Sequence, residues 1–375
     1  MNGIIVHEWM ERTGGAERVV QAMRAAYPQA DVLALWSDLE DRQIRESWMG
    51  KSPLRHHKLL AIPAMLSTWR HQKAGDVDWA LVSSHLFAHH VRFHDAEELR
   101  KYVYCHTPAR YLWEPSLDIR GDSRFARSAA SIIKPIDRRR AQEAFGIAAN
   151  SRFVKDRIEK CWDRESTVIY PPVEVTELQL TKDWRDRVSG QELDILDSLS
   201  DAFVLGASRF VAYKNLEFAI DVAEHAGIPA VIAGGGMHEG ALRRRARHSK
   251  VPVYFVIQPS DELLRALMQK ATVFAFGAVE DFGIMPVEAM ALGTPVICGR
   301  AGGVNETVVE GISGFHVDMA LGSHLKQAVE MASLLVPETI AAYARSFSRE
   351  RFIHELKAWV GLEAKDLTAY GALGT

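Results

Sequence analysis

Short apolar runs alternate with segments of helical spacing along the first part of the chain. The runs at 3–6, 31–35, 79–82, 102–105 and 146–149 are each followed by polar or small residues. Residues 16–25 have helical spacing, with Val19, Val20 and Met23 on one side. Strands that are apolar throughout are typical of parallel sheets covered by helices on both faces. We therefore predict a first α/β domain over residues 1–170.

The pattern breaks near Pro171-Pro172, where two prolines exclude a helix and favour extended backbone. A polar stretch at 174–201 follows, without strong apolar periodicity. A second alternation then begins. Strands are predicted at 203–207, 230–233, 253–256, 272–276 and 295–298, and helices at 216–226, 239–247, 260–269 and 285–292. We place the linker at the two prolines and a second domain at 171–350.

The last part of the chain predicts one more helix, at 352–370, with Leu356, Trp359, Val360 and Leu367 as its apolar positions. We expect residues 351–375 to pack back on the first domain. The predicted fold class is α/β, with two Rossmann-like doubly wound domains facing across a cleft. Ligands of open parallel sheets bind at the carboxyl ends of the strands.

Composition places the chain among ordinary globular proteins, since 47% of its 375 residues are hydrophobic and 25% are charged. No apolar run approaches the roughly 20 residues of a membrane span, and the amino terminus lacks the pattern of a signal peptide. The three cysteines match no zinc pattern, and their odd number argues against a disulfide framework. We expect a cytoplasmic protein.

The formal net charge of -3 implies no general attraction to nucleic acid. Residues 1–165 carry 26 Lys and Arg against 22 Asp and Glu, whereas the remainder carries 19 against 26. Basic clusters lie at 55–58, 69–73 and 138–140. Each such cluster is more often a solvated helix face than a binding site. The functional interpretation is a basic face in peripheral contact with an anionic membrane, on the inner face of the cytoplasmic membrane.

The strongest chemical signal is the segment Glu280-Asp281-Phe282-Gly283-Ile284-Met285-Pro286-Val287-Glu288. It follows a predicted buried strand and begins a helix, and Pro286 suits a first helical turn. Carboxylates accept hydrogen bonds from adjacent hydroxyls, such as those of a hexose and a ribose. The free N–H groups of the helix start favour a diphosphate. Taken alone, the segment is equally consistent with an acidic helix start.

This Glu-x7-Glu segment, followed by residues 289–297 and by Gly302-Gly303-Val304-Asn305-Glu306, resembles the signature of the retaining GT-B glycosyltransferases of the family 4 type. Gly14-Gly15-Ala16-Glu17-Arg18 resembles the amino-terminal glycine loop of that family. Residues 149–151 and 170–173 resemble its domain junction. The resemblance extends from Ile4 to about Phe352. It implies a hexosyltransferase with an acceptor-binding first domain and a donor-binding second domain.

The resemblance assigns donor contacts residue by residue. It implies that Glu280 contacts the donor hexose and Glu288 the ribose, with backbone contacts from Phe282, Gly283 and Ile284. Arg209 and Lys214 match the basic pair that neutralises the diphosphate, although Ser208 stands where the family has glycine. Cations at this point would stabilise the leaving group. Gly14 and Gly15 could approach the acceptor or the donor phosphates, and Gly234 is a weaker candidate for a position near the donor phosphate or base.

His106 matches the histidine that faces the reaction centre in the His-Thr-Pro segment of the family. A lone histidine is more often structural, but the end of a parallel strand favours function. Tyr111 and Trp113 could stack on an acceptor sugar, and plain packing is an equal alternative. We count His106, Glu280, Arg209 and Lys214 as the catalytic set.

No Asp-x-Asp metal motif is present, so we expect a metal-independent reaction without a cofactor. The resemblance implies retention of configuration by front-face attack, with the leaving phosphate accepting the proton. The segments 280–288 and 105–114 are similar to bacterial polysaccharide mannosyltransferases. They favour GDP-mannose as donor and a lipid-linked, polyprenyl-diphosphate or polysaccharide-precursor glycan as acceptor. A UDP-sugar donor (glucosyl or N-acetylhexosaminyl), a GT-B-like phosphorylase or epimerase, and a non-catalytic nucleotide-binding protein remain alternatives.

Overall fold

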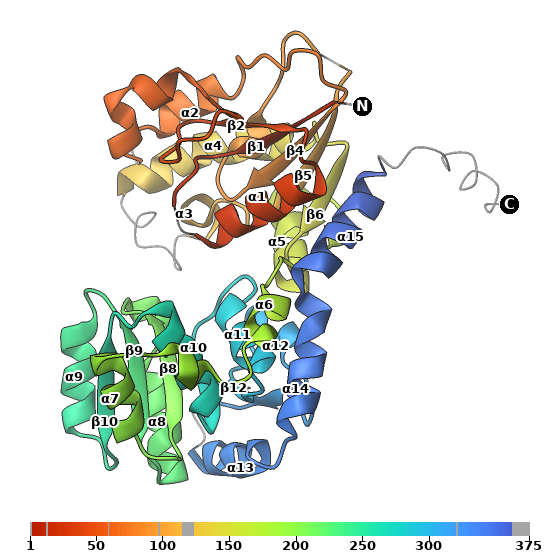
Figure 1. Cartoon of the computed structure of the whole chain (residues 1–375). Helices are drawn as coiled ribbons and strands as arrows, with labels where there is room; N and C mark the ends of the chain where they lie inside the picture. Colours follow the sequence, from red (N-terminus) through yellow and green to blue (C-terminus); the bar gives the residue numbers. More distant parts are fainter. Residues whose placement is uncertain are drawn as a thin grey trace, which may run out of the picture. The chain divides into compact units, whose positions relative to one another are not determined.

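The computed structural model describes residues 2–12, 14–58, 60–96, 98–114, 124–319 and 322–361 (Figure 1). The chain divides into two compact units. Unit 1 comprises Met1–Pro172 with Glu350–Thr375, and unit 2 comprises Val173–Arg349. Each unit contains an all-parallel sheet with helices around it, so the predicted α/β fold class with two Rossmann-like domains is confirmed.

The sheet of unit 1 has the strand order β3-β2-β1-β4-β5-β6-β7. Its strands are β1 Gly3–His7, β2 Asp31–Ala34, β3 Ile44–Glu46, β4 Trp79–Ser84, β5 Arg100–Cys105, β6 Gly146–Ala149 and β7 Thr167–Val168. Its helices are α1 Gly15–Ala26, α2 Ile62–Thr68, α3 Arg110–Trp113, α4 Arg124–Ala141 and α5 Arg152–Trp162, with 3-10 turns η1 Trp48–Lys51, η2 Pro53–His56 and η3 Ala88–His90.

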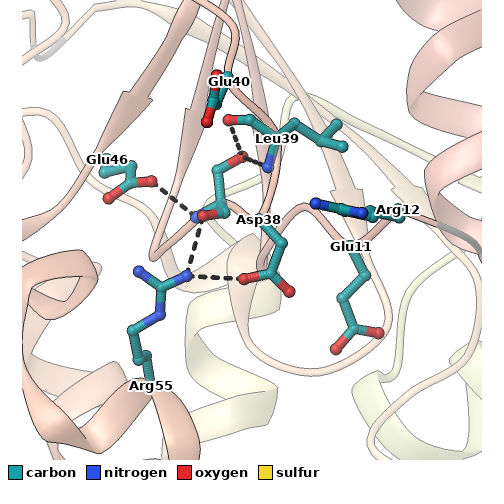
Figure 2. Close-up of a pocket in the computed structure, with 8 residues that line it drawn as sticks. Glu11, Arg12, Asp38, Leu39, Glu40, Glu46 and Arg55 are labelled. Carbon is teal, nitrogen blue, oxygen red and sulfur yellow. Dashed lines mark hydrogen bonds and ion pairs between the residues drawn. The ribbon is translucent and has the colours of Figure 1, made fainter.

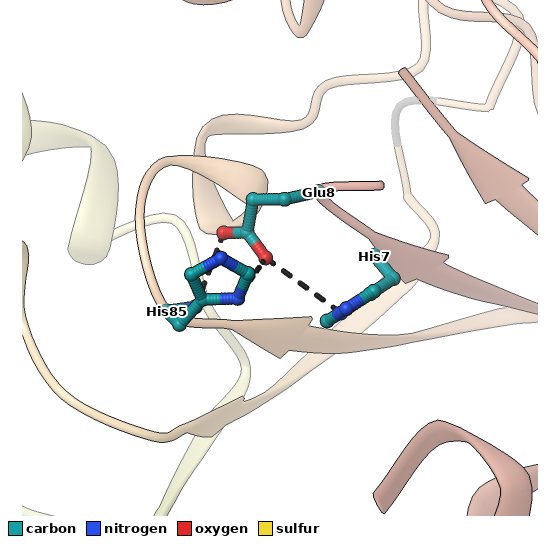
Figure 3. A group of neighbouring side chains, drawn as sticks. All are labelled: His7, Glu8 and His85. Atoms are coloured by element: carbon teal, nitrogen blue, oxygen red, sulfur yellow. Dashed lines mark hydrogen bonds and ion pairs between the residues drawn. The ribbon is translucent and has the colours of Figure 1, made fainter. Parts of the chain in front are cut away.

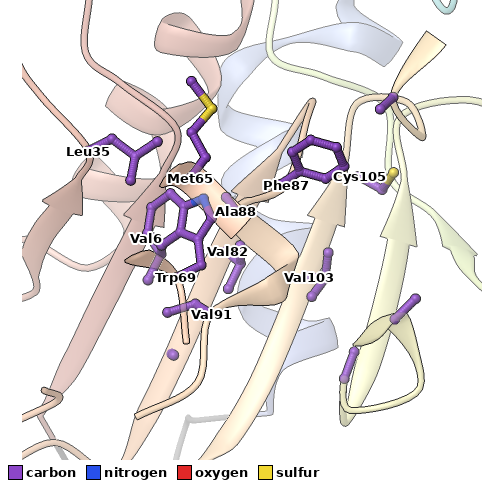
Figure 4. Packing of buried hydrophobic residues seen from close by; sticks show 14 of the residues in the cluster. Val6, Leu35, Met65, Trp69, Val82, Phe87, Ala88, Val91, Val103 and Cys105 are labelled. Atoms are coloured by element: carbon purple, nitrogen blue, oxygen red, sulfur yellow. The ribbon is translucent and has the colours of Figure 1, made fainter. Parts of the chain in front are cut away.

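One face of this sheet carries the larger part of the core of unit 1. Val6, Val82 and Val103 from β1, β4 and β5 pack with Met65 of α2 and the buried Trp69 (Figure 4). Side chains at alternate positions of a strand point to opposite faces. The neighbouring residues Ile5, Leu81 and Tyr102 therefore build a second core on the other face. Burial of both faces explains why these strands are apolar throughout.

The second face of the sheet is covered by α1 and by the last helix, α15 Arg349–Val360. Phe352 meets Tyr104 with 5.5 Å between ring centroids, and Trp359 meets Tyr102 at 5.3 Å. This helix thus returns to unit 1, although the chain has already passed through unit 2. The remainder of the helix predicted at 352–370, from residue 362 on, lies outside the described residues.

The sheet of unit 2 has the strand order β10-β9-β8-β11-β12-β13. Its strands are β8 Val204–Arg209, β9 Ala230–Gly235, β10 Val253–Ile257, β11 Val273–Phe276, β12 Val296–Cys298 and β13 Gly314–His316. Its helices are α6 Val175–Leu180, α7 Gln191–Ser198, α8 Glu217–Ala226, α9 Glu239–Arg247, α10 Asp261–Lys270, α11 Ile284–Ala291, α12 Val304–Thr307, α13 Gly322–Ala332 and α14 Pro337–Ala344, with 3-10 turns η6 Trp184–Arg187, η7 Ala212–Lys214 and η8 Arg345–Phe347.

The stretch 174–201, which lacked periodicity in the sequence, is not a plain linker. It forms α6, η6 and α7, which pack against α10 and α11. Each element has at most two turns, so it buries only one or two side chains, such as Leu178, Trp184 and Leu196. Periodicity cannot show in so few residues. The short edge strands β3 and β7 escaped prediction because they are only partly buried.

Each sheet has one point where the strand order reverses. In unit 1 this point lies between β1 and β4, and in unit 2 it lies between β8 and β11. At such a point the connections leave toward opposite sides, which opens a crevice at the carboxyl ends of the two strands. The residues that follow these four strands are therefore the first place to look for a site.

Candidate active site

In unit 2, the loop between β11 and α11 carries the Glu280–Glu288 segment to the reversal point. Gly283 is the residue before α11 and has φ 92°, a left-handed conformation that favours glycine. It turns the chain into α11, whose first N–H groups, as in any helix, have no carbonyl acceptor within the helix itself. Glu288 lies on α11 and is partly buried.

Glu280 forms an ion pair with Lys214, which ends η7 after β8. Their side chains are 20% and 13% exposed. The next residue, Asn215, donates a hydrogen bond of 3.2 Å to the Gly277 carbonyl, so the loops after β8 and β11 are tied twice. The structure thus brings together two predicted site residues that are 66 positions apart.

The Gly302-Gly303 turn holds Glu280 from the other side. The Gly303 N–H donates to the Glu280 carbonyl at 2.8 Å. A Cβ at Gly302 would lie 2.7 Å from that carbonyl oxygen, and a Cβ at Gly303 would overlap the Asp281 carbonyl oxygen. Only glycine allows this approach, so the glycines quoted in the sequence motif have a packing reason.

Other predicted donor residues occupy different settings. Arg209 ends β8, is exposed, and donates to the Tyr213 hydroxyl at 3.1 Å. The Phe282 ring is 4% exposed and meets Phe347 edge-on, so this side chain serves the core. Ile284 begins α11 and is partly buried.

Gly234 has φ 135°, and a Cβ there would overlap the Ser208 carbonyl oxygen. The close approach of β9 to β8 therefore already explains this glycine. Any contact between Gly234 and the donor stays a prediction.

In unit 1, His106 directly follows β5 and lies near the reversal point. Its Nε2 is 2.8 Å from the Ser83 hydroxyl at the end of β4. Burial, together with the neighbouring His85 and His7, lowers the pKa of His106 to about 3. The imidazole is therefore neutral at physiological pH and can serve as a hydrogen-bond partner, but not as a cation.

Glu8, which the sequence reasoning missed, is the centre of this region. Its side chain is 0% exposed, and Oε1 accepts the N–H groups of His85, Leu86 and Ala88 at 2.8–3.1 Å. Its Oε2 lies 3.1 Å from Nδ1 of His85, and Figure 3 shows the two side chains facing each other. Burial alone would raise the pKa of Glu8, but these partners hold it far below its usual range. Burial also lowers the pKa of His85, and the Glu8 charge outweighs it and raises that pKa.

The group His7, Glu8 and His85 has the composition of a metal site, and its donor atoms lie within 4.8 Å of one another. Nδ1 of His7 lies 3.1 Å from the Ser83 carbonyl, so in a neutral imidazole Nδ1 carries the proton and Nε2 retains a lone pair. The one feature of the sequence that could have pointed to this group is the carboxylate of Glu8, immediately after β1.

A second group of this kind, His89, His90 and Asp137, is also buried. Both oxygens of Asp137 accept N–H groups, among them the indoles of Trp113 at 2.8 Å and Trp162 at 2.7 Å. Asp137 thus joins α4 to α3, α5 and η3. This network explains the buried charge as a structural hub.

The predicted acceptor residues Tyr111 and Trp113 lie on α3 and are partly buried. Trp113 uses its indole N–H on Asp137, and Tyr111 meets Phe87 edge-on. Both pack against the core of unit 1. Their role as a sugar platform stays a prediction.

The Gly14-Gly15 pair precedes and begins α1. Gly14 is extended, with φ 170°, and a Cβ there would overlap the carboxylate of the buried Glu17. The glycine therefore makes room for a side chain of its own helix. Gly15 is exposed at the start of α1.

The basic clusters are largely engaged within unit 1. Arg55 pairs with Asp38, and Arg70 pairs with Glu143. Arg138 donates to the Cys161 carbonyl, and Arg140 donates to the Leu66 carbonyl. The three cysteines are buried and form no disulfide. Among the described residues, no helix is long and apolar enough to cross a membrane.

Residues 195–339 match the family model described as "Glycosyl transferases group 1". The matched segment lies within unit 2. It includes Arg209, Lys214 and the whole Glu280–Glu288 segment, whereas the predicted donor residues Gly14 and Gly15 lie outside it.

Individual relatives resemble parts of the chain. It is 27% identical over 212 residues to the alpha-1,3/1,6-mannosyltransferase alg-2 of Neurospora crassa, covering 46% of this chain and 44% of that protein. Over 98 residues it is 41% identical to the GDP-mannose-dependent alpha-(1-6)-phosphatidylinositol monomannoside mannosyltransferase of Mycolicibacterium smegmatis, covering 23% and 25%. The matches thus span less than half the length of these curated relatives.

The fold of the whole chain has solved counterparts. Anabaena Alr3699/HepE, crystallised in complex with UDP-glucose, superposes with a TM-score of 0.67 at 17% identity. The superposition covers 96% of this chain and 99% of that one. At this identity the likeness concerns the fold alone.

Proposed function

We propose that the chain is a retaining glycosyltransferase that moves a hexose from a nucleotide diphosphate sugar to a glycan. The observation that carries the proposal is the Lys214–Glu280 pair at the reversal point of unit 2, within the group 1 domain. A carboxylate that accepts sugar hydroxyls and a cation that neutralises a diphosphate are what donor binding requires.

Each predicted residue then has a role. Glu280 accepts hydrogen bonds from the hexose hydroxyls, and Glu288 from those of the ribose. Lys214 and the exposed Arg209 bind the diphosphate. The backbone from Phe282 to Ile284 offers its N–H groups at the start of α11, where negative charge is favoured. We assign the neutral imidazole of His106 to the reaction centre.

The favoured donor is GDP-mannose, because two of the relatives are named as mannosyltransferases and one as GDP-mannose-dependent. The alternative is a UDP-sugar, in keeping with the UDP-glucose bound to the HepE structure. The proposed acceptor is a lipid-linked or polysaccharide-precursor glycan. A cytoplasmic location with peripheral contact to an anionic membrane would bring the enzyme to such an acceptor.

The test is release of GDP or UDP from a panel of GDP-mannose, UDP-glucose and UDP-N-acetylglucosamine. Turnover of one donor is expected, and binding without turnover of any donor would favour the non-catalytic alternative. NMR of the product decides the stereochemistry, since an inverted linkage refutes retention. Because Lys214 and Arg209 supply the positive charge, EDTA should leave turnover unchanged.

A further inference from the structure

Unit 1 carries charged side chains both on an open surface and in an enclosed group. The hollow beside the segments after β1 and β2 is lined largely by exposed charged side chains, and it includes the ion pair of Asp38 with Arg55 at 2.7 Å (Figure 2). Water solvates groups of this kind, so the hollow requires no ligand. The group His7, Glu8 and His85 differs, because the side chains of His7 and Glu8 are 0% exposed. Water does not reach these two, so their polar atoms need partners within the protein or a bound ligand.

Three atoms of this enclosed group have no hydrogen-bond partner in the part of the chain that the structure describes. They are Nε2 of His7, Oε2 of Glu8 and Nδ1 of His85. The last two form an ion pair 3.1 Å apart, without the alignment of a hydrogen bond. One donor atom from each residue lies within 4.8 Å of the others. Buried polar atoms without a partner are uncommon, and three in one group indicate a shared ligand.

The remaining atoms of these side chains are held as those of metal ligands usually are. Nδ1 of His7 faces the Ser83 carbonyl at 3.1 Å, and Oε1 of Glu8 accepts three backbone N–H groups at 2.8–3.1 Å. The Trp9 ring lies edge-on against His85, with 5.0 Å between centroids. Metal-binding imidazoles and carboxylates are typically oriented by outer hydrogen bonds of this type. The side chains are therefore positioned before an ion binds.

The atom types and their spacing fit zinc. Zn–N and Zn–O distances of about 2.0–2.2 Å place neighbouring ligands of a tetrahedral ion about 3.4 Å apart, and Oε2 of Glu8 lies 3.1 Å from Nδ1 of His85. Two imidazoles and one carboxylate are a common zinc ligand set, whereas Mg²⁺ and Ca²⁺ prefer oxygen. The His85 side chain is 26% exposed, so an ion can enter from solvent.

The second buried group of this composition, His89, His90 and Asp137, lacks such a set of atoms. Both ring nitrogens of His90 are engaged, with Asp137 at 2.8 Å and with Arg140 at 2.9 Å. Both oxygens of Asp137 accept hydrogen bonds. Within this group, as far as the chain is described, only Nε2 of His89 has no hydrogen-bond partner. One atom cannot hold an ion, so composition alone does not distinguish the two groups and the hydrogen bonds do.

We propose that His7, Glu8 and His85 form a binding site for one divalent transition-metal ion of the zinc type, with water as a further ligand. The site goes beyond the proposed function. The ion would neutralise the Glu8 charge and join the ends of β1 and β4. It has no part in the transfer step, for which Lys214 and Arg209 supply the positive charge, so the expectation for EDTA is unaffected.

The experiment measures binding of Zn²⁺ to the metal-depleted full chain by isothermal titration calorimetry. One ion per chain is expected, with a Kd of about 1 μM or below. His85→Ala removes a ligand at a partly exposed position and should weaken binding by at least about 100-fold. Mg²⁺ in about 100-fold excess should not displace the zinc. The matched control is His94→Ala, an exposed histidine of unit 1 outside the group, which should bind as the wild type does.

X-ray absorption of the zinc complex identifies the ligands without any variant, and circular dichroism checks that His85→Ala is folded. Nitrogen and oxygen neighbours at about 2.0–2.2 Å are expected. A sulfur neighbour would place the ion at a cysteine and overturn the proposal. Failure of the wild type to bind zinc would also overturn it, as would equal binding by the wild type and His85→Ala. None of these measurements uses a sugar donor, so their outcome is independent of the proposed function.

Discussion

At the reversal point of unit 1, charge is fully enclosed, with Glu8 at 0% exposure and surrounded by N–H groups from its neighbouring loop. At the reversal point of unit 2, Glu280 and Lys214 keep 20% and 13% of their side chains exposed and form an ion pair. The same architecture thus holds charge in two ways. A buried carboxylate with backbone partners orders a loop and shifts the pKa of its neighbours, whereas a partly exposed pair can be reached from solvent.

The comparison predicts that Glu280→Ala abolishes function and spares the fold. Transfer should fall by about 10³-fold, equivalent to about 4 kcal/mol, because the hexose loses its carboxylate partner and Lys214 loses its ion pair. Steady-state kinetics measure the loss, and thermal melting monitors the fold. Glu338→Ala, an exposed position on α14, is the control and should retain full activity. Wild-type turnover in Glu280→Ala would disprove the assignment.

In unit 1 the corresponding change should act on stability. Glu8→Ala leaves the N–H groups of Leu86 and Ala88 without their acceptor and His85 without its counter-charge. We expect a loss of about 3 kcal/mol in the free energy of unfolding, measured by urea denaturation. Glu11→Ala, on the same segment but 38% exposed and paired with Lys58, should cost less than about 1 kcal/mol. Similar losses in both variants would contradict the role of burial.

Acid should weaken unit 1 before unit 2. The folded-state pKa is lowered to about 4 at His7 and to about 3 at His106, so below pH 6.5 the unfolded chain binds more protons than the folded one. Stability present above pH 6.5 is therefore lost as the pH falls, by at most about 1.4 kcal/mol per pH unit for each histidine.

His85 partly offsets this loss. Its raised pKa stabilises unit 1 below pH 6.5, and that contribution disappears as the pH rises through the folded value. Hydrogen exchange between pH 7.5 and 5.5, expressed as protection factors, compares β1 and β5 with β8 and β11. Earlier loss of protection in unit 2 would contradict the prediction.

The smallest expected effect concerns the glycines of unit 2. Gly303→Ala places a methyl group against the Asp281 carbonyl, so the loop must shift, at a cost of about 1–2 kcal/mol and with weaker donor binding. Gly240→Ala meets only the flexible end of Arg244, at 3.6 Å, and should be neutral or slightly stabilising. Calorimetry measures the change in the free energy of unfolding for both variants. An equal response at the two positions would show that the loop tolerates the methyl group.

Prediction from sequence succeeded best where the signal is contiguous. The strands of both sheets are apolar throughout because both faces are covered, and their runs were recognised within a few residues of β1, β4, β5, β8, β9 and β11. The elements α6, η6 and α7 were missed because each is too short for a period to show. The packing of Trp113 and Phe282 could not be predicted either, because the sequence does not show whether an aromatic side chain faces a ligand or the core.

The sequence by itself determined the two α/β domains and the contiguous Glu280–Glu288 segment, because the hydrophobic period and the glycine and proline positions are local properties of the chain. Only the tertiary structure decided that Glu280 meets Lys214, and that Glu8 rather than His106 alone organises the reversal point of unit 1. Such pairings join residues 66 or 77 positions apart. They follow from strand order and burial, which bring together groups that no local pattern connects.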